Sequence, residues 1–453
     1  MARSRDGARL ARWNGSEILV HSFPQMKVLS RWKVESLAQL QFGPSDKTLM
    51  VAGAAGVRLY DSFTGQAISE PIAGPGRWAD FSPDGDSLIQ VADGQIRAWK
   101  LSPPSLLCDL LADSNAAYWN SPVEKMAGAA FTENPNQIVV VPSLATFRRQ
   151  ADFLRVLDEQ GKVQTGEVKP QAWVDRGRCL ISATPGGQLK AQALHCTGLD
   201  RNHDFPASAA TLAPRAVLFH QQSGVQLLED GRLHPLGPKK ASLLALRSDG
   251  SKLAVAVDKR VDLYRLEGEA AFQICHWRTQ QKVERLFWLE DRVLSGTSSG
   301  TFCHDLESKE LFHLEAAAVA VAPDAGNFCT LQDGQLTLHS PDGSRIAARD
   351  DSDLPLYSPD GSVLAIKSGQ RNLLLLEPSS LRPLTVSLQH RDEIVTIAFD
   401  AKSQRILVCT ENGELRQWPV GHPNQEPFSQ IEARTRRLCP GRLDPATGTF
   451  LPL

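Results

Sequence analysis

The sequence predicts an all-β protein built from many copies of one short unit. A turn motif recurs far apart in the chain, short apolar runs with partial alternation flank it, and a second turn leads into a further strand-like run. Together these features predict small antiparallel sheets that follow one another along the sequence.

The turn motif is clearest in FSPDG at residues 81–85 and in YSPDG at residues 357–361. Proline presets φ, aspartate hydrogen-bonds its own backbone and glycine takes a positive φ at little cost, so the motif favours a tight reversal. The runs RWADF and DSLIQVA flank the first copy, and Asp93-Gly94 then introduces QIRAWKL. We expect a three-stranded meander here.

The turn aspartate recurs with a regular period. When the longer gaps are divided into whole units, the mean spacing is about 39 residues, which lies in the range of four-stranded propeller blades. Third-strand runs, from EILVHSF near the N-terminus to GELRQWPV near the C-terminus, give eleven candidate units. The marker residues are Asp6, Asp46, Asp84, Asp249, Asp324, Asp360 and Asp400. The period therefore predicts a β-propeller architecture.

The number of units predicts how the chain is divided. Eleven units exceed the four to eight blades of a single ring. We expect two propellers, one over residues 1–237 with irregular blades and one over residues 238–453 with a closing C-terminal tail. One ring of seven blades with extra units is the alternative. Because the first unit enters almost directly at its turn, we expect the C-terminal tail or another chain to supply strands that it lacks.

One unit, LQHRDEIVTIAFDAKSQRILVCTENGELRQWPV at residues 388–420, resembles the WD40 family of β-propellers. His390, the apolar positions of the run IVTIAF, the turn at residues 411–413 and Trp418 fall where the family has its histidine, inner strand, tight turn and strand-ending tryptophan. The resemblance implies a WD40-like propeller in which His390 hydrogen-bonds within its blade. It also implies that Trp99 and Trp418 pack between blades.

The C-terminal run IEARTRRLCPGRLDPATGTFLPL is similar to tails that close WD40 regions in bacterial signalling proteins, including STAND-type ATPases and kinase-linked receptors. The matching positions are residues 432–435, Leu443-Asp444, Gly448 and Leu451. The resemblance implies a bacterial sensor or scaffold. No GxxxxGK[ST] loop and no kinase loop occurs in the sequence, so a signalling enzyme would be a separate chain.

The composition of the chain argues against several classes of protein. The 49 basic and 51 acidic residues give a net charge of −2, which argues against a general nucleic-acid binder. No apolar run is long enough for a membrane span, and the N-terminal residues have no signal-peptide core. The eight cysteines are scattered without a C-x-x-C pair, so we expect reduced thiols and a cytoplasmic protein without disulfides.

Two Cys-His neighbours, Cys275-His276 and Cys303-His304, are candidate metal ligands or a candidate thiol nucleophile with its base. Adjacent strand residues face opposite sides of a sheet, so neither pair can bind one metal ion by itself. We expect a core cysteine and an exposed histidine in each pair. The sequence therefore predicts no catalytic residue, no cofactor site, no metal site and no enzyme activity.

Two segments are candidate partner sites. The insert SPPSLLCDLLADSNAAYW near residues 102–118 carries leucines at helical spacing, so we expect a short amphipathic helix that covers a propeller edge or docks a partner through Leu107 and Leu111. The C-terminal basic cluster could contact an acidic partner or be a solvated face. It contains Arg434, Arg436, Arg437 and Arg442, with Arg416 nearby.

These expectations combine into a binding function. We expect a non-catalytic protein-binding scaffold or sensor subunit of a bacterial signalling or defence complex, which binds a protein partner through propeller faces and loops. We expect no specific nucleic acid and no membrane. A propeller hydrolase or dehydrogenase with carboxylates around a central channel is one alternative, and a purely structural subunit of a larger assembly is another.

Overall fold

The structure is a computed structural model that describes residues 1–54, 56–69, 71–72, 236, 239–268, 270–385 and 387–420. Between residues 78 and 235 it describes the strands given below, and in the C-terminal tail it describes residues 441–443 and 450–452. None of these residues is helical, so the described chain is all-β, as predicted. Within it, no helix is long and apolar enough to cross a membrane.

Six sheets of the described chain have four strands each, hydrogen-bonded in the order in which they occur in the sequence. The first is β1 (Ala2–Arg3), β2 (Arg9–Trp13), β3 (Glu17–Ser22) and β4 (Val28–Lys33). The others are β19 (Ala209–Leu212), β20 (Arg215–His220), β21 (Gly224–Glu229) and β22 (Arg232–Pro235); β23 (Leu243–Leu246), β24 (Lys252–Val257), β25 (Arg260–Glu267) and β26 (Ala270–Arg278); β27 (Val283–Leu289), β28 (Arg292–Thr297), β29 (Gly300–His304) and β30 (Glu310–Leu314); β31 (Ala317–Val321), β32 (Phe328–Gln332), β33 (Gln335–His339) and β34 (Arg345–Arg349); and β35 (Asp353–Tyr357), β36 (Leu364–Ser368), β37 (Asn372–Leu376) and β38 (Leu388–Gln389).

The remaining sheets have other strand numbers. The three-stranded sheets are β5 (Gln39–Phe42), β6 (Thr48–Gly53) and β7 (Gly56–Asp61); β8 (Trp78–Phe81), β9 (Ser87–Ala92) and β10 (Gln95–Lys100); β12 (Lys125–Phe131), β13 (Gln137–Ser143) and β14 (Arg155–Asp158); and β15 (Lys169–Val174), β16 (Cys179–Ala183) and β17 (Leu189–Ala193). A five-stranded sheet has the order β11 (Ser105–Asp109), β41 (Glu414–Pro419), β40 (Arg405–Thr410), β39 (Ile394–Phe399) and β18 (Cys196–Thr197), and β42 (Gly441–Leu443) pairs with β43 (Phe450–Pro452).

The repeated aspartate joins the first and second strands of a sheet, as the turn motif predicts. Asp360 Oδ1 accepts hydrogen bonds from Ser358 Oγ at 2.7 Å and from the Ser362 amide at 3.0 Å, while Gly361 has a φ of 72°. Asp84 lies outside the described residues, although β8 and β9 flank it. Asp400 lies between the neighbouring strands β39 and β40 of the five-stranded sheet. The marker residues found between the first two strands of a sheet are Asp6, Asp46, Asp249, Asp324 and Asp360.

The third-strand runs also match the structure. Each of the eleven predicted runs contains a strand, and these strands are β3, β7, β10, β14, β17, β21, β25, β29, β33, β37 and β41. Glycine or a polar turn precedes most of them, which is where one antiparallel strand reverses into the next. The local chemistry of the turns thus places the strands even where the aspartate is lost.

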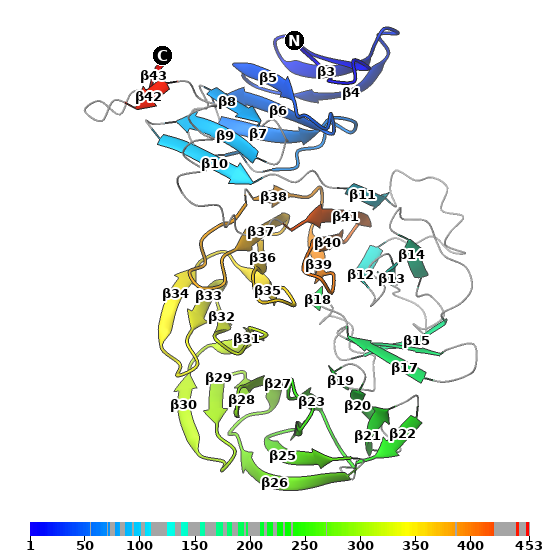
Figure 1. Cartoon of the computed structure of the whole chain (residues 1–453), viewed down its shortest axis with the longest axis vertical. Helices are drawn as coiled ribbons and strands as arrows, with labels where there is room; N and C mark the ends of the chain where they lie inside the picture. Colours follow the sequence, from blue (N-terminus) through cyan, green and yellow to red (C-terminus); the bar gives the residue numbers. More distant parts are fainter. Residues whose placement is uncertain are drawn as a thin grey trace.

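The first strands of successive sheets contact one another along a curved path. β23 contacts β27, β27 contacts β31, β31 contacts β35 and β35 contacts β39, and β12 also contacts β39. Figure 1 shows these first strands toward the middle of the lower part of the molecule, with β26, β30 and β34 on the outside. Neighbouring sheets therefore pack face to face, and their fourth strands form an outer rim.

The hydrophobic core lies between sheets, and one part of it joins distant segments of the chain. Met50 and Leu59 of the second sheet belong to the same buried cluster as Leu373, Ile394 and Trp418. The Gln389 amide donates a 3.0 Å hydrogen bond to the Ile68 carbonyl, which fixes the two segments at backbone level. Figure 1 shows β5 to β10 beside β37, β38 and β41. The sheets formed by residues 39–100 thus pack on those near the C-terminal end.

The expected helix near residues 102–118 is wrong over its described part. Residues 105–109 form β11, which pairs antiparallel with β41 from Ser105 opposite Gln417 to Asp109 opposite Glu414. The leucine spacing fitted a helix, but β41 offers an open edge whose backbone groups need partners, and strand pairing satisfies them. The rest of the insert lies outside the described residues.

Two further expectations concern strands and domains. The first sheet has four strands from residues 2–33 alone, so it needs no strand from the tail or another chain, and β42 and β43 pair with each other.

β11 pairs with β41, and β18 pairs with β39, so one sheet contains strands from both sides of residue 238. The division of the chain into two propellers stays a prediction.

Candidate functional site

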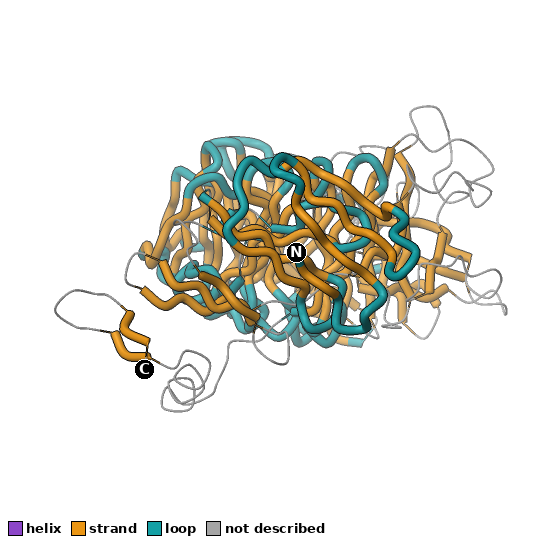
Figure 2. Tube along the Cα trace, turned by 90° about the horizontal axis from the view of Figure 1, so that it is seen from above, coloured by secondary structure: helices purple, strands orange, loops and turns teal. Residues whose placement is uncertain are grey.

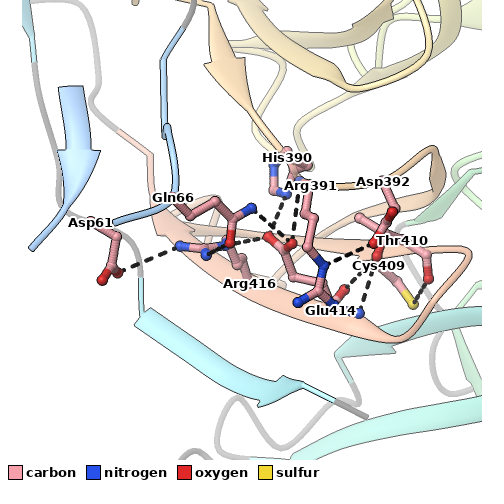
Figure 3. A network of polar contacts seen from close by, with 9 residues as sticks. All are labelled: Asp61, Gln66, His390, Arg391, Asp392, Cys409, Thr410, Glu414 and Arg416. Atoms are coloured by element: carbon pink, nitrogen blue, oxygen red, sulfur yellow. Dashed lines mark hydrogen bonds and ion pairs between the residues drawn. The ribbon is translucent and has the colours of Figure 1, made fainter. Parts of the chain in front are cut away.

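A network of charged and polar side chains lies where the second sheet meets β41 (Figure 3). Asp61 ends β7 and Gln66 follows in the loop after it, whereas Glu414 and Arg416 lie on β41. His390 lies between β38 and β39. The network therefore joins residues near 60 to residues near 400 in the region of the shared hydrophobic core.

Glu414 is the centre of the network and is fully buried. Its carboxylate accepts hydrogen bonds from Gln66 Nε2 at 3.1 Å, from the Arg391 amide at 3.3 Å and from Arg416 Nε. Its Oε1 also lies 3.4 Å from His390 Nδ1. These donors replace the hydration that the carboxylate loses on burial.

Arg416 is buried beside it and also reaches the second sheet. Its Nη2 donates a 2.8 Å hydrogen bond to Gln66 Oε1, and its Nη1 lies 3.8 Å from Asp61 Oδ2. Gln66 thus donates to the carboxylate and accepts from the guanidinium. Glu414 and Arg416 are two residues apart on β41, so both side chains lie on the same face of the strand. That face therefore holds a buried pair of opposite charges.

The surroundings set the charge states. Burial by itself raises the pKa of Glu414, but the contact with His390 and the charge of Arg416 outweigh it and hold the pKa well below its usual range. Burial lowers the pKa of His390 more than Glu414 raises it, so the ring is neutral near pH 7. Trp418 packs against this ring edge to face, with ring centroids 5.8 Å apart.

This arrangement lies inside the packed core. The three central side chains, His390, Glu414 and Arg416, are all at most 2 % exposed, so a substrate would have to unpack the core to reach them. The charges are compensated inside the network, and removing one member would leave the other buried and unpaired. The core position predicted for Trp418 is confirmed. His390 is buried, but neither ring nitrogen has a hydrogen-bond partner among the described residues, so the hydrogen bond expected within its blade is not found, and its contact with Glu414 is the 3.4 Å approach described above. The position of the Trp99 side chain lies outside what the structure describes.

The residues predicted to bind a partner are only partly described. Leu107 lies in β11 at the register shift between Leu106 and Cys108. Leu111 and Arg434, Arg436 and Arg437 lie outside the described residues. Arg416, which we expected near that basic surface, is instead buried, because Glu414 two residues earlier on the same strand face pairs with it.

The Cys-His pairs differ from one another. Cys275 is half-buried and His276 is exposed, in line with the alternation expected for that pair. At the second pair the expectation is wrong for the histidine, because Cys303 and His304 are both buried and His304 stacks on Trp277 with ring centroids 4.5 Å apart. The two side chains lie on opposite faces of β29 and both faces are covered, because Cys303 packs with Ala318 and Phe328 of the following sheet while His304 lies against Trp277 of the preceding one.

The thiols whose side chains the structure describes are free, and most of them are buried. They are Cys275, Cys303, Cys329 and Cys409. Burial raises the pKa of Cys303 and of Cys329 to about 12, so both stay protonated and weakly nucleophilic near pH 7. Within the described residues, no group of three histidine, cysteine or carboxylate side chains could hold a metal ion.

No protein-family model matches the sequence, and no curated protein matches it.

The pairing of Glu414 with Arg416 was not predicted from the sequence, although the run GELRQWPV contained a signal for it. Its charged residues occupy the same strand face as Trp418, which we assigned to the core. Charges on a core-facing row indicate a buried ion pair.

Proposed function

We propose that this chain is a non-catalytic scaffold or sensor subunit that binds a protein partner. The observation that carries the proposal is where the exposed apolar side chains lie. In the described chain, most large apolar side chains with high exposure lie on the fourth strands of sheets or in the turn that leads to one. They are Phe23, Met26, Val28 and Leu29 at β4, Phe272 and Ile274 on β26, Leu311 on β30 and Ile346 on β34.

An apolar outer rim favours binding over catalysis. Exposed apolar side chains that gather on one kind of surface mark sites of protein interaction. Some side chains could in principle act as an acid, a base or a nucleophile, namely His390, Glu414 and the buried thiols. They are packed in the core or belong to the network. Edge strands also offer free backbone groups to a partner strand.

The arrangement that we propose for the sheets is a closed, WD40-like propeller running from β11 to β41. Two contacts support closure: β12 contacts β39, and β11 adds to the outer edge of β41. In such an arrangement a strand from the start of the ring completes the last blade. The same contacts favour one ring over a division at residue 238, with the sheets of residues 2–100 packed beside it.

The wider role that we propose rests on the resemblance of the C-terminal tail. It is a sensor or scaffold in a cytoplasmic bacterial signalling or defence complex, with a separate signalling or effector enzyme as partner. The partner would bind the rim and the loops, and the buried network would hold the N-terminal sheets in place.

The test is reconstitution with partners captured from cells that produce the protein. We expect the purified chain to be stable alone and to form a defined complex with a second purified protein in the absence of nucleotide and metal. Replacing Leu311 and Ile346 with serine should weaken that complex without lowering the melting temperature. Turnover of ester, phosphoester or dehydrogenase substrates by the chain alone would contradict the proposal, and a chain that unfolds without its complex would favour a purely structural subunit.

A further inference from the structure

In the part of the chain that the structure describes, the first sheet has one packed face and one largely open face. Ala11, Ile18 and Val20 are fully buried and pack against Phe42 and Leu49 of the second sheet. Residues paired across strands share a face, so the registers assign the other residues to the open side. Figure 2, viewed from above, shows the first sheet and the N-terminus on the near side of the molecule.

The open face, which we call the basic face, consists of three cross-strand rows. Arg12 pairs with Leu19 and Leu19 with Arg31, so a leucine lies between two arginines. The neighbouring rows add two more cations, Arg3 and Lys33, together with apolar residues, the buried His21 and one acid, Glu17. These residues are Arg3, Leu10, His21 and Val28 in one row, and Glu17 and Lys33 in the other.

The cations of this face have no carboxylate partners. Arg3, Arg12, Arg31 and Lys33 are all exposed, and no carboxylate of the described chain forms an ion pair with any of them. Glu17 is the single acid on the face. Other basic residues of the described chain, such as Lys367, do pair with acids. The basic face therefore carries an uncompensated positive charge.

Part of the face is held in position. Arg12 Nε donates a 3.0 Å hydrogen bond to His21 Nε2, and His21 Nδ1 lies 3.1 Å from the Met26 carbonyl oxygen. The Arg3 guanidinium lies over the Phe23 ring, 5.1 Å from its centroid. A fixed guanidinium loses less conformational freedom when it binds a carboxylate in a bidentate manner.

We propose that the basic face is a docking surface for an acidic protein surface, one that presents carboxylates around an apolar patch. Leu10, Leu19 and Val28 would form the apolar centre and the arginines and Lys33 the charged surround, which is the usual anatomy of a protein interface. The apolar centre and the net charge of −2 of the whole chain favour a protein over a nucleic acid. This inference rests on the proposed binding function and specifies one of its surfaces.

The experiment uses the full chain and a fluorescein-labelled peptide of alternating glutamate and leucine as the probe. We expect the peptide to bind in fluorescence anisotropy at low salt, and Arg12→Glu with Arg31→Glu to weaken binding at least about tenfold, since each change removes an attraction and adds a repulsion. Arg12→Lys with Arg31→Lys should give an intermediate loss, because charge is kept but the planar fork is lost. The control pair Arg278→Glu with Arg382→Glu makes the same charge change at exposed arginines elsewhere and should bind normally.

Two outcomes would overturn the inference. Equal weakening by the control pair would mean that net charge, not this face, attracts the probe. Stronger binding of a 20-base-pair DNA duplex than of the peptide, lost on the same reversal, would assign the face to nucleic acid. If the reversal leaves a complex with a native partner intact, the basic face is the wrong surface while the binding function stands.

Discussion

Arginine side chains lie in opposite environments in the five-stranded sheet and in the first sheet. On β41, Arg416 is buried, pairs with the carboxylates of Glu414 and Asp61 and donates a hydrogen bond to Gln66. On the first sheet, Arg12 and Arg31 point away from the core and have no acidic partner in the described chain. The comparison separates charge that holds the fold together from charge that is free to bind.

The difference follows from what covers each face. The core-facing side of β41 lies against the second sheet, so a charged side chain there is stable only if an oppositely charged side chain is buried beside it. Within the residues that the structure describes, the first sheet is packed on one side only, and its other side can keep hydrated cations at little cost. Substitutions at the two places should therefore differ sharply in their effect on stability.

Breaking the buried pair should have the largest effect. Glu414→Gln leaves Arg416 buried without its counter-charge, and we expect a loss of roughly 3 to 5 kcal/mol in the free energy of unfolding. Denaturant unfolding measures this loss. Glu307→Gln, at an exposed turn, is the matched control and should change stability by no more than about 0.5 kcal/mol. A similar small loss for both variants would mean that the network contributes nothing.

Removing both charges should cost less than removing one. Glu414→Leu with Arg416→Met replaces the pair by apolar side chains of comparable size, and buried pairs replaced in this way are often neutral or stabilising. We expect the double variant to be more stable than Glu414→Leu alone by about 1 to 3 kcal/mol. Additive losses in a double-mutant cycle would show that the two side chains are not coupled.

These two predictions concern a site that local sequence patterns did not reveal. The turn aspartates and the third strands were predictable because each depends on a few neighbouring residues, as at Asp360 and Gly361. The pairing of β11 with β41 and the contact of Gln66 with Glu414 join residues more than 300 positions apart. No local period encodes such contacts, and the burial of His304 likewise depends on Trp277 of the neighbouring sheet.

The pH dependence of stability should be moderate in size. Burial lowers the pKa of His304, His339 and His390, so in the folded state they stay neutral at a pH where the unfolded chain, with a histidine pKa of about 6.5, binds protons. The unfolded state therefore takes up protons first, and stability is full above about pH 7 and falls as the pH drops through about 6.5. Thermal unfolding at a series of pH values checks this, and His390→Asn should make the dependence shallower. A melting temperature that rises on acidification through this window would reverse the assignment.

The smallest effect on stability should come from the basic face. Arg12→Glu with Arg31→Glu changes two exposed side chains, so we expect the free energy of unfolding to stay within about 0.5 kcal/mol of the parent chain. Thermal melts and denaturant unfolding measure it. A loss comparable to that of Glu414→Gln would mean that these arginines hold the fold together and that the two sheets do not differ as described.

Zero-length cross-linking of the native complex tests the comparison most directly. Carbodiimide joins a lysine amine to a carboxylate only when the two are in contact, and Lys33 supplies the amine on the basic face. In a complex isolated from cells that produce the protein, we expect cross-links between Lys33 and an aspartate or glutamate of another protein, and their loss in the Arg12→Glu, Arg31→Glu variant. Cross-links from a partner that form elsewhere on the chain, with none at Lys33, would contradict the assignment of the free charge to binding.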